Sequence, residues 1–290
     1  MPTSFLSSFE DWINVLRKQL QQQAPELIDI FETYASEAKF GRTFIDPDLK
    51  KLQPNAEILE IGAGAMLLSC QLVREGFSVT ALEPVGEGFS HFTKLRLFVT
   101  EQALLTGHAP KLLLLPAEEM NVENTFDFAF SIYVMEHVGN IEMTLRKINT
   151  ALKQKAYYRF ITPNYAFPYE PHFNIPTFFN KKITEKILGG KIFADSRFPD
   201  PRGVWASLNW ISVGELKQAD KLIEGLKVSF NKNVLFNTFQ RVLLDKQFSA
   251  RRSQFIVNFV KIMSTLKIDH LLKFIPANFS PIIDCTITKD

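Results

Sequence analysis

The sequence predicts an α/β protein whose core is a mostly parallel, seven-stranded sheet. Two observations predict it: short apolar segments alternate with longer amphipathic segments, and a glycine-rich turn follows the first apolar segment. Short apolar strands that alternate with helices are typical of a parallel sheet with helices on both faces. With 290 residues, 46% of them hydrophobic, the chain can bury the core that such a sheet needs.

Two helices are expected before the first strand. Ser7 and Glu10 have the spacing of a capping box, and apolar residues then recur at helical spacing. These apolar residues are Trp12, Val15, Leu16 and Leu20. A second helix is expected over residues 25–38, ended by the turn at 40–42.

The remaining elements follow the strand-helix alternation. The expected strands are 58–61, 78–82, 112–115, 126–132, 157–161, 226–230 and 281–288. The expected helices between the first five strands are 66–75, 89–105 and 140–152. Prolines and aromatic residues predict a long ordered loop over 165–176, and about fifty mainly helical residues separate the last two strands. We interpret this helical segment between the last two strands as an insertion in the same domain.

This pattern divides the chain into four regions. They are N-terminal helices (1–38), a ligand-binding core (39–164), an acceptor-binding loop and cap region (165–225), and the last two strands with their helical insertion (226–290).

Composition and charge limit the partners and the compartment. A net charge of +2 gives no broad basic surface for nucleic acid, so none is expected as a partner. Cys70 and Cys285 have apolar neighbours and no C-x-x-C spacing, which predicts buried free thiols and a reducing compartment. The N-terminal residues do not resemble a signal peptide, and charged residues interrupt every apolar run. We therefore expect a cytoplasmic protein without stable membrane insertion, although peripheral contact remains open.

The turn after the first strand points to a bound nucleotide or related ligand. Gly62 and Gly64 let the backbone pass close to a ligand and expose amide groups at a helix N-terminus. A dinucleotide fingerprint, G-x-G-x-x-G, would need a third glycine where this chain has Leu67. The spacing therefore disfavours a dinucleotide.

The segment Glu60-Ile61-Gly62-Ala63-Gly64-Ala65-Met66 resembles the acidic-x-G-x-G-x-G motif of class I S-adenosylmethionine-dependent methyltransferases, with Met66 in place of the last glycine. The resemblance implies a Rossmann-like fold and S-adenosylmethionine as cofactor. It also implies that Glu60 holds the methionine part of the cofactor and that the glycines run along its adenosine.

Further residues extend this resemblance over about 39–164. Glu83, before Pro84, stands where the family places the carboxylate that binds both ribose hydroxyls. Ala117-Glu118 matches the adenine-contacting position, and Ser131 ends the matching fourth strand. The fifth strand resembles that of small-molecule O-methyltransferases. The implied cofactor-binding residues are Glu60, Gly62, Ala63, Gly64, Glu83, Pro84, Ala117, Glu118 and Ser131.

Candidate catalytic residues follow the fourth and fifth strands, at the sheet edge where ligands bind. We favour His172 as a general base that takes a proton from an acceptor hydroxyl, with Glu170 or Tyr169 orienting it or the acceptor. His137 is the second candidate, and it could instead order its loop. Packing of a structural histidine in the 165–176 loop is the alternative for His172.

The sequence predicts no metal ion at this position. Ubiquinone-type O-methyltransferases and small-RNA 3′-end methyltransferases bind a divalent metal with E-x-x-E-H. The corresponding segment here is Tyr133-Val134-Met135-Glu136-His137, in which tyrosine replaces the first glutamate.

The expected activity is methyl transfer to a hydroxyl oxygen of a small, partly apolar acceptor. Several phenylalanines lie in segments expected to cap the carboxyl edge of the sheet, and they suggest an apolar pocket. They are Phe173, Phe178, Phe179, Phe236 and Phe239. Two alternatives stay open: a non-catalytic S-adenosylmethionine-binding partner or sensor protein, and a nicotinamide oxidoreductase.

The helix expected over 253–266 has an apolar face with basic residues around it. That face comprises Ile256, Phe259, Val260, Met263 and Leu266. The cations are scattered and Asp269 interrupts them, so we expect a cap over the acceptor site near His172. On this interpretation the protein does not bind anionic vesicles.

Overall fold

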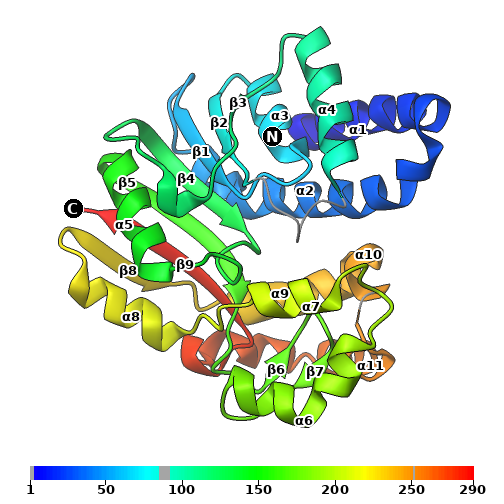
Figure 1. The fold of residues 1–290 in the computed structure, drawn as a ribbon, viewed down its shortest axis with the longest axis vertical. Helices are drawn as coiled ribbons and strands as arrows, with labels where there is room; N and C mark the ends of the chain where they lie inside the picture. The colour runs from blue at the N-terminus through cyan, green and yellow to red at the C-terminus, as the bar shows by residue number, and fades with distance from the viewer. Residues whose placement is uncertain (1–2, 85–91, 251) are drawn as a thin grey trace. The chain divides into compact units, whose positions relative to one another are not determined.

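The computed structural model of the protein describes residues 3–84, 92–250 and 252–290 (Figure 1). One sheet has the strand order β3-β2-β1-β4-β5-β9-β8. Its strands are β1 (Glu57–Ile61), β2 (Ser78–Leu82), β3 (Lys111–Leu113), β4 (Phe126–Ile132), β5 (Leu152–Pro163), β8 (Leu226–Phe230) and β9 (Ile282–Lys289). Strand β1 pairs in parallel with β2 and β4, and β2 with β3, whereas β9 is antiparallel to both β5 and β8. The predicted mostly parallel, seven-stranded α/β fold is confirmed.

The chain forms two compact units. The first comprises residues 1–131 and 150–156, and the second comprises 132–149 and 157–290.

In the first unit, the two N-terminal helices are longer than predicted. Helix α1 (Thr3–Gln23) begins before Ser7, so the capping box does not mark its start. Helix α2 (Ile28–Leu49) continues through the predicted turn at 40–42. The reason is Arg42, which is buried and forms ion pairs with Glu75, at 2.9 Å, and Asp46, at 3.0 Å. A buried, paired guanidinium inside the helix outweighs the turn preference of the neighbouring glycine.

The other helices of this unit follow the predicted alternation. They are α3 (Leu67–Arg74) and α4 (Thr93–Leu105). The predicted start of the latter helix, at residue 89, lies outside the described residues. Helix α3 packs on α2 and on β2. Strand β5 begins five residues before its predicted start, where Lys153 pairs with Asp127 at 2.9 Å and lets a charged segment enter the sheet.

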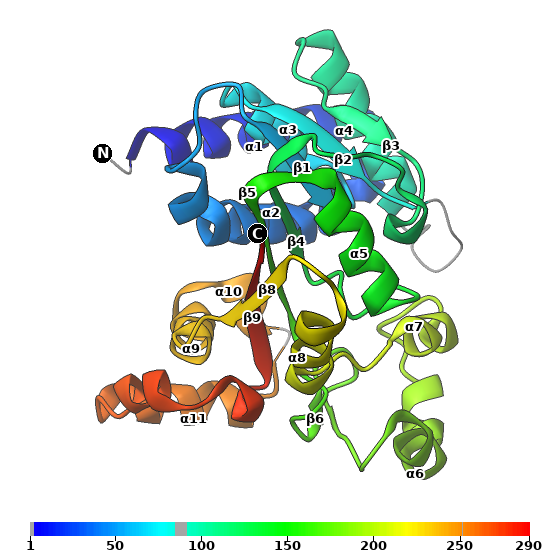
Figure 2. The ribbon, with the colours of Figure 1, turned by 90° about the vertical axis from the view of Figure 1, so that its left-hand side faces the viewer.

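In the second unit, the loop predicted over 165–176 contains a small hairpin. Strand β6 (Tyr169–Glu170) pairs antiparallel with β7 (Ile175–Pro176), and this fixes the backbone on both sides of His172. The helices of this part are α5 (Ile141–Ala151), α6 (Lys181–Phe193), α7 (Pro201–Ser207) and α8 (Val213–Leu222). Figure 2 shows β8 and β9 side by side, as their pairing requires.

The segment between β8 and β9 is helical, as predicted. It contains α9 (Val234–Leu244), α10 (Lys246–Ala250), α11 (Gln254–Thr265), and the 3-10 turns η4 (Asp269–Phe274) and η5 (Ala277–Phe279). Helix α11 buries Val257 and Val260 in a core shared with Val242 and Phe248. Of the apolar face predicted for this helix, Phe259 and Leu266 are instead exposed, because α9 covers the adjacent face.

Two further expectations concern the thiols and the helices. Cys70 and Cys285 are free and buried, as predicted. Within the described ranges, every helix is too short or too polar to cross a bilayer.

Candidate functional site

The glycine turn of the first unit is held by backbone hydrogen bonds across the ends of neighbouring strands. Gly62 N and Ala63 N both donate to Leu82 O, at 2.7 and 3.2 Å. Gly64 N donates to Glu83 Oε2 at 2.7 Å. The turn between β1 and α3 is therefore fixed to the carboxyl end of β2, the edge at which parallel sheets bind ligands.

Met66, which stands in place of the last glycine of the motif, adopts a backbone conformation that glycine favours. Its φ is +68°, in the left-handed region that favours glycine, and its side chain is fully buried. This residue is the N-cap of α3 and not part of the helix, so helix propensity does not decide its effect. The left-handed conformation costs a non-glycine residue roughly 1–2 kcal/mol, and burial of the thioether side chain offsets this.

We expect Met66→Gly to destabilise the protein by about 1–3 kcal/mol. Loss of a buried methionine side chain costs about 2–5 kcal/mol, and relief of backbone strain returns about 1–2 kcal/mol. Urea denaturation measures the difference. Met66→Leu is the control, since it keeps both burial and strain and should change stability by less than about 1.5 kcal/mol. A stabilised glycine variant with much tighter cofactor binding would mean that the native motif is degenerate.

Two buried carboxylates face this turn. Glu60 accepts a hydrogen bond from the hydroxyl of Ser69 on α3, and Glu83 accepts from Gly64. Burial, with a further contribution from the charge of Glu83, raises the pKa of Glu60 to about 8. Burial also raises the pKa of Glu83. Two acidic groups in a low-dielectric site favour a ligand with positive charge or with hydroxyl donors.

The raised pKa of Glu60 predicts that stability falls as pH rises from about 4.5 to about 8. In this range the folded state keeps a proton that the unfolded state releases, so higher pH favours unfolding. At about 1.4 kcal/mol per pKa unit, the total is on the order of a few kcal/mol. Glu60→Gln should flatten this dependence in urea titrations at pH 6 and 8.5, whereas Glu119→Gln, at an exposed site, should not. An unchanged slope in Glu60→Gln would contradict the prediction.

The other predicted cofactor residues lie at the same edge. Ala117 is buried and begins the 3-10 turn η3 (Ala117–Glu119), with Glu118 half-buried beside it. Ser131 is buried near the end of β4, and Pro84 follows Glu83 directly. Tyr34 of α2 was not predicted: a Cβ at Gly64 would lie 3.5 Å from its ring. Its ring covers the turn, and a single tyrosine in an amphipathic helix gives no signal of this.

A cavity of about 570 Å³ lies at the opposite, amino edge of these strands. It is lined by residues such as Glu57, Ser78 and Lys153 and contains none of the predicted site residues. We assign no role to it because its position is remote from the glycine turn.

In the second unit, the β6-β7 hairpin holds His172 against a buried carboxylate. His172 Nδ1 lies 2.6 Å from Glu170 Oε1. The same carboxylate accepts from Tyr165 Oη at 3.2 Å, His172 N at 3.0 Å and Phe173 N at 2.7 Å. Burial opposes ionisation of both partners, but their mutual hydrogen bond outweighs it, so the pKa of Glu170 is lowered and that of His172 is raised. Glu170 thus orients the imidazole and makes its outer nitrogen more basic.

Tyr169 does not contact His172 through its hydroxyl. It donates instead to Asn174 Oδ1 at 2.6 Å. Of the two residues predicted to orient His172, Glu170 is therefore the one that contacts its ring.

His137 is also held through its Nδ1 atom. Ser207 Oγ lies 2.9 Å from this atom and donates its own proton to Val204 O at 2.8 Å. Since the hydroxyl has a single proton, Nδ1 of His137 must be the donor, which leaves a lone pair on Nε2. Burial, together with the charges of His172 and Lys181, lowers the pKa of His137 to about 3, so the ring is neutral at physiological pH.

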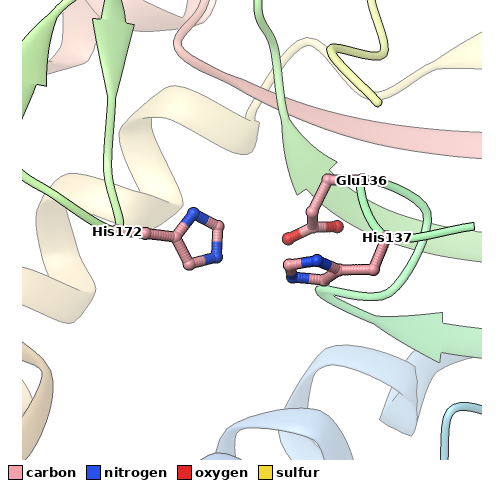
Figure 3. A group of neighbouring side chains, drawn as sticks. All are labelled: Glu136, His137 and His172. Atoms are coloured by element: carbon pink, nitrogen blue, oxygen red, sulfur yellow. The ribbon is translucent and has the colours of Figure 1, made fainter. Parts of the chain in front are cut away.

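Glu136 completes a group with the two histidines. Figure 3 shows its carboxylate and both imidazoles pointing toward one another, and one ligand atom from each lies within 4.8 Å of the others. Its Oε2 accepts from Thr162 Oγ1 at 2.8 Å, whereas its Oε1 is buried without a hydrogen-bond partner. Burial raises the pKa of Glu136 to about 7. An unsatisfied buried oxygen beside two imidazole lone pairs suits a proton donor or a cation.

The predicted aromatic residues do not form one pocket. Phe173 is buried against Phe198 and Trp205, whereas Phe179 is 97% exposed. Phe239 packs on the core that α11 shares with α9. These phenylalanines therefore have different surroundings, and an apolar acceptor pocket stays a prediction. Three residues that fix this group were missed: Tyr165, Thr162 and Ser207. Thr162 and Ser207 lie 26 and 70 residues from their partners Glu136 and His137, and no pattern in the 165–176 loop marks Tyr165 as the partner of Glu170.

Comparison with known proteins gives matches along most of the chain. A family model described as a methyltransferase domain matches residues 34–250. An uncharacterized protein of Mycobacterium tuberculosis is 42% identical over 274 residues, which cover 94% of this chain and 92% of that protein. A ubiquinone biosynthesis O-methyltransferase of Rickettsia bellii is 25% identical over 99 residues, covering 34% of this chain and 38% of the relative. The solved structure of a putative sarcosine dimethylglycine methyltransferase from Galdieria sulphuraria aligns with a TM-score of 0.48 and 18% identity, covering 88% and 86% of the two chains.

Proposed function

Since the chain belongs to the methyltransferase domain family, we propose that it transfers a methyl group from S-adenosylmethionine to a hydroxyl oxygen of a small, partly apolar acceptor. The observation that carries the choice of a hydroxyl is the Glu170–His172 pair, since proton removal is needed for transfer to oxygen. The two buried free thiols support a reducing compartment, and we infer the cytoplasm.

The first unit supplies the residues for the cofactor. Glu83 accepts hydrogen bonds from the ribose hydroxyls. Glu60, which keeps its proton at neutral pH in the free protein, ionises when the cationic methionine end binds beside it. The peptide groups of Gly62, Ala63 and Gly64 run along the adenosine. These roles agree with two buried acids beside the turn. The amide groups of Gly62, Ala63 and Gly64 already donate to Leu82 O and Glu83, so the turn offers its peptide surface to the cofactor and not free amides.

The reaction is an in-line displacement. The acceptor oxygen forms a bond to the methyl carbon, the carbon–sulfur bond breaks, and its electron pair stays on the sulfur of S-adenosylhomocysteine. His172 Nε2 takes the hydroxyl proton, while Glu170 stabilises the resulting imidazolium. Alignment of oxygen, carbon and sulfur supplies much of the acceleration.

A metal-assisted reaction is the second candidate, and the orphaned Glu136 Oε1 favours it. One carboxylate and two imidazoles, each imidazole oriented through Nδ1, are a donor set that fits a divalent cation. Glu136, His137 and His172 would hold the ion, and the ion would make the acceptor hydroxyl more acidic. Tyr133 stands where the metal-binding E-x-x-E-H motif has its first glutamate, so this chain lacks one carboxylate of that motif. For that reason the metal-free reaction remains our first proposal.

Calorimetry and a transfer assay test the proposal. We expect S-adenosylhomocysteine to bind and NAD not to bind, and labelled methyl groups to reach a hydroxylated acceptor from a panel of phenols and aliphatic alcohols. Binding of NAD instead would contradict the cofactor assignment. Tight S-adenosylhomocysteine binding without transfer to any member would favour the non-catalytic partner or sensor.

A further inference from the structure

Helix α11 exposes an apolar stripe along one face. Phe255, Phe259, Ile262 and Leu266 follow one another at spacings of four, three and four residues, and their exposed fractions are 79, 47, 58 and 62%. At 100° per residue these four side chains lie within about 60° of arc, and at 1.5 Å per residue the stripe is about 16 Å long. Exposed apolar side chains in this pattern differ from the scattered exposure of an ordinary surface.

The opposite face anchors the helix to the protein. Val257 and Val260 are buried in the core with Val242 and Phe248, and α11 packs beside α9 (Figure 2). The side chain of Ser253 caps the helix by accepting from Ile256 N at 3.4 Å. Helix α11 is therefore held in place by its buried face, and the exposed apolar stripe on the other face is not needed to anchor it.

The adjoining 3-10 turns expose three more apolar side chains. These are Leu271, Phe274 and Phe279, at 63, 81 and 69%. Leu271 and Phe274 belong to η4, which packs against α11.

The charged residues of the segment that contains the stripe are almost all positive. Between residues 246 and 280 the sequence has six Lys and Arg residues and a single acid, Asp269. Asp269 is 4% exposed and accepts a hydrogen bond from Gln240 at 2.8 Å. The segment carries a formal charge of 6 − 1 = +5, whereas the whole chain carries +2. Lys261 and Lys267 are exposed on and directly after the helix.

We propose that this face of α11 binds the surface of an anionic membrane. An amphipathic helix that presents phenylalanine and leucine beside lysines inserts its apolar side at the headgroup boundary while the lysines attract anionic lipids. The positive charge favours an anionic membrane over a second copy of the chain, because a second copy would bring an equally cationic segment against the first. This proposal departs from the sequence-based expectation of no vesicle binding, which placed Phe259 and Leu266 on a buried face, whereas both are exposed.

Vesicle co-sedimentation with the full chain tests the proposal. We expect binding to phosphatidylcholine vesicles that contain phosphatidylglycerol, at least about 25-fold weaker binding to phosphatidylcholine alone, and weakening by added salt. The triple variant Phe255→Ser, Phe259→Ser, Ile262→Ser should lower the partition coefficient at least about tenfold. Lys261→Gln with Lys267→Gln should lower it about fivefold for each lysine.

Controls separate this face from general surface hydrophobicity. Leu104→Ser with Leu105→Ser removes two exposed leucines of α4, 65 and 76% exposed, and should leave vesicle binding unchanged. Thermal unfolding verifies that each variant is folded. Equal binding by wild type and triple variant, or no binding by wild type, would overturn the proposal. A dimer in sedimentation velocity that the triple variant abolishes would assign the face to a second copy instead.

Discussion

Replacement of His172 by alanine should slow methyl transfer by about 10²- to 10⁴-fold, the usual contribution of a general base. The loss should appear in kcat, since His172 is assigned to the acceptor proton and not to the cofactor. S-adenosylhomocysteine affinity, measured by calorimetry, should stay within about twofold. An unchanged rate of transfer would mean that another group is the general base, and His137 would be the next candidate.

Glu170→Gln is the matched control for His172. It keeps the shape of the side chain but removes the charge that raises the pKa of His172. We expect a smaller loss of kcat and an acid shift of the limb of the pH profile that reports the base. A merely structural role for Glu170 would lower stability without moving this limb.

Metal titration separates the two candidate mechanisms. If the reaction uses no metal, a chelator leaves activity unchanged and Mn²⁺ gives no heat on calorimetry. If the group of Glu136, His137 and His172 binds a metal, Mn²⁺ binds to the wild type, and His137→Ala weakens that binding. The second outcome would contradict our expectation from Tyr133.

Replacement of Glu83 by alanine should weaken S-adenosylhomocysteine binding by about 10- to 100-fold. The carboxylate provides charge-assisted hydrogen bonds worth about 1.5–3 kcal/mol, and in the structure it also accepts from Gly64 N at 2.7 Å. Glu83→Gln should lose less affinity, since its amide oxygen can still accept from Gly64. Calorimetry measures both variants.

The control for Glu83 is Glu119→Ala, which removes an exposed carboxylate of η3. It should leave affinity unchanged. If Glu83→Ala binds as tightly as the wild type while remaining folded, the ribose assignment is wrong.

Local patterns predicted much of the fold. Strands 78–82, 126–132 and 226–230 were placed to the residue. Gly76 and Gly225 come shortly before the first and last of these runs, and polar residues follow both, whereas 126–132 is marked by its apolar residues alone. The turn predicted at 40–42 failed because Arg42 finds its partner Glu75 only in the folded protein. The start of β5 was missed because Lys153 reads as a loop residue until it pairs with Asp127.

The candidate site could be predicted only in part for the same reason. Glu60 and Glu83 lie at the carboxyl ends of the neighbouring parallel strands β1 and β2, and therefore at one edge of the sheet. This proximity can be predicted from the sequence, because the strand-helix alternation predicts parallel strands. No local pattern brings His172 to Glu136, thirty-six residues earlier (172 − 136), or Ser207 to His137. These contacts form only because the β6-β7 hairpin places His172, and helix α7 places Ser207, beside residues that are distant in the sequence.

The placement of β9 between β5 and β8 has a consequence for how the protein folds. Arg159 and Asp284 form a bidentate ion pair across β5 and β9 although 125 residues separate them. Closing so long a loop costs entropy before any pairing energy is gained, so this half of the sheet should form late. Until residues 282–289 pair, β5 and β8 each present an open edge to other chains. Refolding yield should therefore fall with protein concentration more steeply than native stability alone would imply.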